Sequence, residues 1–137
     1  MKSKLVLSVE QMKYLRELGL NTSDASMCYC CFYGNIEEEW ELEIYEDVIN
    51  QKRDSAFWEI IPTYTLQDIL DKLPTLIIIS SDFYKICIEP SCGYWDIYYY
   101  KSDATELISK KSENIIDAAY DMLCWCIENG YVEKEGK

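Results

Sequence analysis

Histidine is missing from the chain, although the chain has 137 residues. Histidine is the commonest general base, so its absence excludes Ser-His and Cys-His nucleophile pairs and every zinc site that needs imidazole. Glycine is also scarce: the five glycines stand singly, and there is no glycine-rich phosphate loop. We therefore expect a non-enzymatic protein without cofactor or metal, and we assign no catalytic residue. An enzyme would need a set of catalytic groups without histidine.

Basic residues are few. The chain has 13 Lys and Arg against 25 Asp and Glu, a formal net charge of −12. More than half of this excess lies in residues 37–64, which carry nine acidic and two basic groups. Such a chain repels nucleic acid backbones and anionic membranes. We expect no nucleic-acid or membrane partner, and instead an unidentified protein partner or self-association.

Long apolar runs are lacking as well. No stretch reaches the roughly 18 consecutive apolar residues of a membrane-spanning helix, and the N-terminal apolar run is too short for a signal peptide. The seven cysteines are an odd number, which indicates free thiols in a reducing compartment. These features predict a cytoplasmic protein. Since 49% of the residues are hydrophobic, we expect residues 1–137 to fold as a single domain.

Residues 114–129 form the clearest predicted element, an amphipathic helix with both ends marked. Asn114 can cap its N-terminus, Asp117 suits the helix dipole, and Gly130 supplies the left-handed residue that ends it. Its apolar positions recur at helical spacing on one broad face. These positions are Ile116, Ala119, Tyr120, Leu123, Cys126 and Ile127. The helix must therefore pack on a core.

Two shorter helices are predicted from their capping signals. Ser8 with Gln11 begins a helix over 8–18, and Thr65 with Asp68 begins one over 65–73. Apolar patterning predicts strands over 27–33, 39–45, 57–61, 76–79, 83–89 and 94–101. This order lacks regular βαβ alternation. It predicts an α+β fold with an antiparallel sheet of about four to six strands and two or three helices packed mainly on one face.

The strands 83–89 and 94–101 are predicted to form a hairpin around a four-residue loop, Pro90–Gly93. This loop length places Ile88 opposite Trp95 and Ile86 opposite Ile97, on one apolar face that the 114–129 helix covers. The other face is mixed and is expected to meet solvent. Residues 46–56 and 102–113 are polar and are predicted to be connections without regular structure.

An acidic stripe follows from strict alternation in residues 39–45. Trp40, Leu42 and Ile44 are expected to be buried, while Glu39, Glu41 and Glu43 point into solvent. On this interpretation the stripe protects an edge strand, and replacing the three glutamates with glutamine should barely change stability. Alternatives are a metal site, a surface that binds a partner, or an inhibitor that mimics nucleic acid. Mimicry would need a second acidic row, since one strand gives one charge per roughly 7 Å, a wider spacing than that of the phosphate charges along duplex DNA.

The cysteines and one tryptophan are the other candidates. Cys28, Cys30 and Cys31 come from one strand, whose alternation turns Cys31 away from the other two, so we expect small buried side chains rather than a zinc site. Trp125 lies on the side of the 114–129 helix opposite its apolar face. It is either covered by another element or anchors a partner. The possible interaction surface thus comprises Glu39, Glu41, Glu43 and Trp125.

Three segments carry a resemblance to a known group of proteins: 20–27, 62–74 and 116–131. Together they resemble small uncharacterised proteins of Bacteroides-type gut bacteria and their phages or prophages, over about residues 5–132. The resemblance implies a phage or mobile-element origin and a cytoplasmic protein. No activity comes with it, so no functional residue is inherited.

Overall fold

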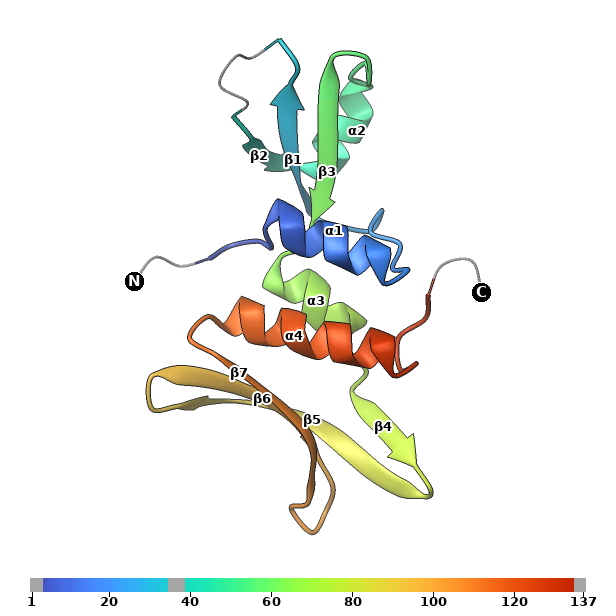
Figure 1. Cartoon of the computed structure of the whole chain (residues 1–137), viewed down its shortest axis with the longest axis vertical. Coiled ribbons are helices and arrows are strands. Elements are labelled where there is room, and N and C mark those ends of the chain that lie inside the picture. The colour runs from blue at the N-terminus through green and yellow to red at the C-terminus, as the bar shows by residue number, and fades with distance from the viewer. Residues whose placement is uncertain (1–3, 35–38, 135–137) are drawn as a thin grey trace.

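The computed structural model describes residues 4–34 and 39–134, and it has an α+β fold with antiparallel sheets, as predicted. The strands divide between two sheets rather than one, with orders β2-β1-β3 and β4-β5-β6-β7. α1, α3 and α4 lie between the two sheets, and α2 lies beside the three-stranded sheet (Figure 1). The elements are α1 Val9–Glu17, β1 Met27–Phe32, β2 Glu41–Ile44, α2 Tyr45–Gln51, β3 Trp58–Thr63, α3 Leu66–Lys72, β4 Leu76–Ile79, β5 Asp82–Ser91, β6 Tyr94–Tyr100, β7 Glu106–Ser112 and α4 Ile115–Glu128.

Helices α1 and α3 begin as the capping signals predict. The Ser8 hydroxyl accepts a hydrogen bond from the Gln11 amide, and the Gln11 side chain accepts one from the Ser8 amide. Thr65 and Asp68 form the same reciprocal pair. Asp68 also accepts hydrogen bonds from the amide and hydroxyl of Ser26, so this cap ties α3 to the start of β1. Local sequence therefore sets both helix starts.

Replacing Thr65 with alanine should lower the free energy of unfolding by about 1 kcal/mol, because the Asp68 amide loses its acceptor. Chemical denaturation of wild type and variant measures the difference. Thr65→Ser keeps the hydroxyl and is expected to stay within about 0.5 kcal/mol of wild type. Equal losses in the two variants would show that the methyl group of Thr65, not its oxygen, matters.

α4 is the centre of the core. Its predicted apolar face is confirmed for Ile116, Ala119, Leu123, Cys126 and Ile127, all of which are buried. Asn114 is the N-cap residue, but its side chain does not cap the helix; it instead donates to Asp117 at 3.4 Å. Gly130 follows the helix with a φ of 82°, which favours glycine. Both helix ends therefore fall within a residue of the prediction.

The four-stranded sheet packs one face on α4. Ile97 and Tyr99 of β6 are fully buried there, and the Tyr99 hydroxyl donates to the Pro74 carbonyl at 2.6 Å. Ile86 and Ile88 are partly buried in the same cluster, so the predicted apolar face of the hairpin is confirmed. This face of the sheet is called the inner face below.

The register of the β5–β6 hairpin differs from the prediction by two residues. Ile88 faces Ile97, and Ile86 faces Tyr99. The pairing continues to Ser91 opposite Tyr94, so the loop has two residues, Cys92 and Gly93, and not four. A shift of two leaves every side chain on its predicted face, because side chains alternate with a period of two. The predicted faces are therefore correct although the predicted pairs are wrong.

Residues 102–113 are not an irregular connection, because β7 lies within them and pairs with β6. Its inner-face positions opposite Ile97 and Trp95 are Lys110 and Ser112, and Ile108, opposite Tyr99, is the apolar residue that this face of the strand supplies to the core. Lys110 is half-buried there. An amphipathic side chain can cover apolar surface with its methylene stem, which explains why the polar sequence still forms a strand.

The three-stranded sheet also departs from the prediction in two places. β3 passes through Pro62 to Thr63, although the strand was predicted to cover residues 57–61. β3 lies at the sheet edge, where a strand residue can lack an amide hydrogen. Residues 46–56, predicted as a loop, contain most of α2, which begins directly after β2. Gly34 and Asn35 form a pair that predicts a turn after β1, and Asn35 lies outside the described ranges.

Candidate interaction surface

The structure splits the predicted acidic stripe. Glu39 and Glu41 are exposed, but Glu43 is half-buried. The apolar side chains of the same strand, expected to be buried, are open to solvent: Leu42 is 39% and Ile44 is 53% exposed. The alternation is correct, and Trp40, just before β2, packs partly buried against the main core, but the predicted burial of Leu42 and Ile44 is wrong.

The reversal follows from α2. Because this helix begins directly after β2, it folds back over the sheet face that carries Cys28, Cys30 and Glu43. Val48 of α2 packs on both cysteines and forms a small second core. The side of β2 that carries Glu43 is therefore the side that α2 covers.

Glu43 is held by a charged partner. The Arg53 guanidinium donates two hydrogen bonds to its carboxylate, both 2.7 Å, and lies 4.5 Å from the centre of the Trp58 ring. The hydrogen bonds from Arg53 hold the pKa of Glu43 below its usual range. Glu43 is thus ionised and locally neutralised, which leaves Glu39 and Glu41 as the exposed charges of the predicted stripe.

The thiols beside Glu43 are buried. The Cys28 and Cys30 sulfurs lie 3.7 Å apart, and burial raises the pKa of both thiols. A protonated thiol is a poor nucleophile and a poor metal ligand. Within residues 4–34 and 39–134, no three His, Cys, Asp or Glu side chains converge in a geometry that could hold a metal ion. This cluster packs the interior of the small sheet.

Trp125 lies on α4, away from the glutamates of β2 (Figure 1). It is half-buried and stacks on Tyr131, with ring centres 5.5 Å apart and planes at 27°. The C-terminal segment therefore covers part of the indole. The four predicted surface residues do not form one site.

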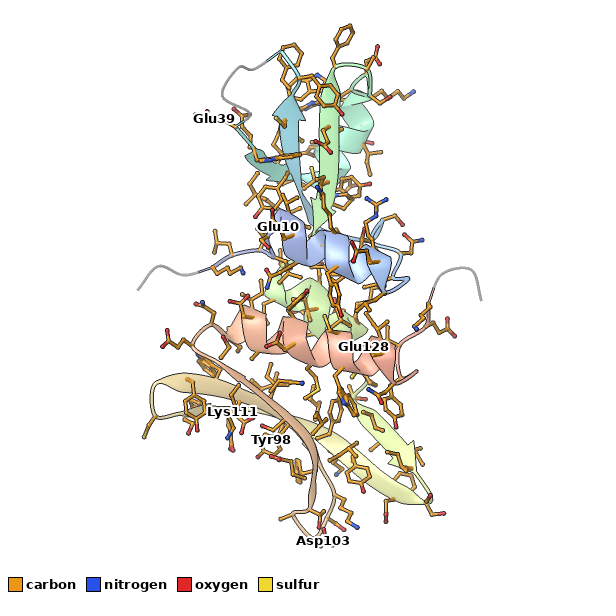
Figure 2. The ribbon with its side chains drawn as sticks, in the orientation of Figure 1. Glu10, Glu39, Tyr98, Asp103, Lys111 and Glu128 are labelled. Atoms are coloured by element: carbon orange, nitrogen blue, oxygen red, sulfur yellow. The ribbon has the colours of Figure 1, made fainter. Side chains whose placement is uncertain are left out.

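The structure exposes a different surface, the side of the four-stranded sheet that faces away from α4. We call it the outer face. Among the described elements, the three central helices lie on the opposite side of this sheet (Figure 1). Strand alternation places Tyr98 and Lys111 on the outer face, at the end of the molecule opposite Glu39 (Figure 2). Sequence reasoning assigned a mixed, solvent-facing side to β5 and β6 but did not identify it as a site.

The middle of the outer face combines aromatic rings with charged residues of both signs. Tyr98 and Tyr100 have ring centres 5.6 Å apart, and the Lys111 ammonium lies 5.5 Å from the ring centre of Tyr94. The contact with the Cys87 thiol, followed by burial, raises the pKa of Tyr98, which is therefore neutral. The charged residues of β5, β6 and β7 on this face are two lysines and three carboxylates: Lys85, Lys111, Glu89, Asp96 and Glu106.

One corner of the outer face is apolar. Ile78 of β4 lies opposite Phe83 of β5, and these side chains are 58% and 55% exposed. Leu76, two residues before Ile78, is also exposed. We call Leu76, Ile78 and Phe83 the apolar corner. A depression of about 390 Å³ borders it, lined by Ser81, Asp82, Phe83, Lys85, Tyr100, Lys101 and Ser102.

The apolar corner gave no recognisable signal in the sequence. All four residues of β4 are apolar, so both faces of the strand read as buried. Ile77 is indeed buried on the inner face. Only the pairing with β5 distinguishes the buried side from the exposed one.

Comparison with protein-family models, with curated proteins and with solved structures found no match. In the part of the chain that the structure describes, no helix has both the length and the apolarity to cross a membrane.

Proposed function

We propose that this chain is a non-enzymatic interaction protein of the cytoplasm, and an accessory protein of a phage or mobile element. It binds a protein through the outer face of the four-stranded sheet. The observation that carries the proposal is the apolar corner: Leu76, Ile78 and Phe83 are exposed together on a sheet face. Contiguous exposed apolar side chains on a soluble domain are typical of a binding surface.

The composition of the outer face suits a protein partner. Tyrosine is enriched in the buried centres of protein interfaces, and charged groups there are few or paired. Tyr100 lines the depression beside Phe83, and Tyr98 packs against Tyr100. The Asp96 carboxylate accepts a hydrogen bond from the Ser109 hydroxyl at 2.5 Å. The face carries an excess of one carboxylate, so a partner can cover it without burying a large excess of one charge.

Mimicry of nucleic acid is less well supported. It requires rows of uncompensated carboxylates at phosphate-like spacing. Glu43 is paired with Arg53, so the predicted row is reduced to Glu39 and Glu41 on its strand. The outer face does not supply a second row, because its three carboxylates come from three different strands and lie among two lysines.

Affinity capture tests the proposal when it compares two matched variants. The tagged chain is incubated with an extract of a Bacteroides-type bacterium, and bound proteins are identified by mass spectrometry. Phe83→Ser should lose the captured partner. Phe57→Ser is the control. Phe57 is exposed to nearly the same extent as Phe83, 57% against 55%, but it precedes β3 of the other sheet. A partner that Phe83→Ser retains and Phe57→Ser loses would refute the outer face as the binding surface.

A further inference from the structure

We infer that the protein that meets the apolar corner is a second copy of this chain. The two copies pair through β4, antiparallel and about a two-fold axis, so that their four-stranded sheets become one continuous sheet. This inference goes beyond the proposed function, because a copy paired edge to edge meets Leu76 and Ile78 at the rim of the sheet and extends the outer face instead of covering it. It also adds a new feature, the free edge of β4.

β4 differs from the other edge strands of the described sheets. β2 carries Glu41 and Glu43, β3 carries Glu59 and Pro62, and β7 carries charges from Glu106 to Lys111. Charged residues and proline on an edge block the addition of another strand. β4 reads Leu-Ile-Ile-Ile and has neither, and residues 75–81 around it are uncharged. The sequence protects three edges and leaves the fourth open to pairing.

The backbone of β4 has groups free to pair. The Thr75 carbonyl accepts a hydrogen bond from the Ile86 amide at 3.3 Å, so Thr75 is a hydrogen-bonded position of the β4–β5 ladder. In an antiparallel ladder these positions alternate. Ile77 therefore also turns its backbone groups toward β5, while Leu76 and Ile78 turn theirs outward at the sheet edge. These two residues offer two amide donors and two carbonyl acceptors.

Two constraints limit the register, and the use of every free backbone group selects one. Opposed residues of an antiparallel pair must lie on the same face of the sheet, and the outward-facing residues of one copy must meet those of the other. Leu76 opposite Ile78 of the second copy meets both constraints and uses all the free backbone groups. Ile77 then faces its own counterpart across the two-fold axis. The side chains of Leu76 and Ile78 from both copies form one apolar strip, with Phe83 beside it on each side.

Charge also favours the β4 edge. Two copies with a net charge of −12 each repel one another, and the repulsion is weakest where they meet through uncharged segments. A four-residue edge with two exposed side chains, Leu76 and Ile78, is smaller than the interfaces of stable dimers, which bury about 1,200 Å² or more. The dimer is therefore weak and reversible, and added salt should strengthen it by screening the repulsion.

Sedimentation velocity on the full chain over a range of concentrations tests the inference. The wild type should shift from monomer to dimer as concentration rises, and at lower concentration when salt is added. Ile78→Lys should raise the dimer dissociation constant by roughly tenfold or more, because it places a charge in the apolar strip. Ile44→Lys is the matched control: Ile44 is also an exposed isoleucine on a four-residue edge strand, and this variant should dimerise as the wild type does.

Backbone amide exchange measured by NMR supplies a second readout. In the concentrated wild type, the amides of Leu76 and Ile78 should exchange more slowly than in dilute samples, and those of β2 should not change. A monomeric wild type at every concentration and salt level would overturn the inference. So would a dimer that Ile78→Lys leaves intact, or one that Ile44→Lys abolishes. If Phe83→Ser still loses a captured partner while the wild type is monomeric, the proposed function stands and this inference alone fails.

Discussion

Replacing Ile97 with alanine should lower the free energy of unfolding by about 3 kcal/mol. Ile97 is fully buried in the core cluster on the inner face of β6, between the sheet and α4. Truncation removes buried methyl groups and leaves a cavity that the surrounding helices and strands fill only partly. Denaturant unfolding followed by circular dichroism measures the loss.

Ile78→Ala is the control for this prediction. Ile78 belongs to the same sheet and carries the same side chain, but it points from the outer face and is more than half exposed. Its truncation should cost less than about 1 kcal/mol, mostly through strand propensity. Similar losses for the two variants would mean that another part of the protein covers the outer face, and would contradict the assignment of inner and outer faces.

Glu43→Gln should lower the free energy of unfolding by about 1–2 kcal/mol, because Arg53 loses its charged, bidentate partner in a half-buried site. Glu41→Gln, two residues earlier on the same strand, should change it by less than about 0.5 kcal/mol. The sequence alone predicts negligible effects for both. Equal stability of the two variants would indicate that the Glu43–Arg53 pair contributes no more than an exposed ion pair.

The pH dependence gives an independent check on Glu43. Its pKa is lowered in the folded state by Arg53, so its contribution is fully present above the unfolded value of about 4.3. The contribution is lost as the pH falls through the folded-state pKa. The stability difference between wild type and Glu43→Gln should therefore be constant near neutral pH and shrink in acid. A difference that persists unchanged in acid would assign the effect to packing rather than to charge.

The sequence predicted the helices well where two local signals coincide. α1 and α3 each combine a capping box with an apolar stripe, and α4 combines helical spacing with a terminal glycine. α2 has neither kind of start signal, since its N-cap position is Ile44, whose side chain makes no capping bond. Its sequence is polar apart from Val48 and two other residues, and it was predicted as a loop. Tertiary contacts with the small sheet, not propensity, define this helix.

The strand predictions show which properties alternation determines. Alternation assigned residues correctly to the two sides of β2, β5 and β6, whatever the exact pairing. It did not predict which side of β2 is covered, because that depends on where the chain goes after Ile44. Because α2 was not predicted, the burial predicted for Leu42 and Ile44 was wrong, and the ion pair of Glu43 was not expected.

The candidate surface was harder to predict than the fold. The sequence analysis selected Glu39, Glu41, Glu43 and Trp125. The glutamates lie far from Trp125, Glu43 is paired with Arg53, and Trp125 stacks on Tyr131. The apolar corner arises from β4 and β5, whose partnership depends on a turn at Ser80 and Ser81, both with positive φ. Positive φ is uncommon for serine, so nothing in the sequence marks a tight hairpin there. The site follows from tertiary geometry rather than from a motif.

The distribution of the thiols makes the protein convenient for fluorescence work. Five of the seven cysteines are buried, Cys87 is half-buried, and Cys92 is exposed in the β5–β6 turn. Burial raises the pKa of Cys124 and of Cys126 to about 11, which slows their alkylation further. A maleimide dye should therefore mark Cys92 first in the native chain. Since Cys92 follows Phe83 by nine residues along an extended strand, the dye would sit roughly 30 Å from the apolar corner, far enough not to disturb it. Energy transfer between donor-labelled and acceptor-labelled chains would then report their encounter with all native residues in place.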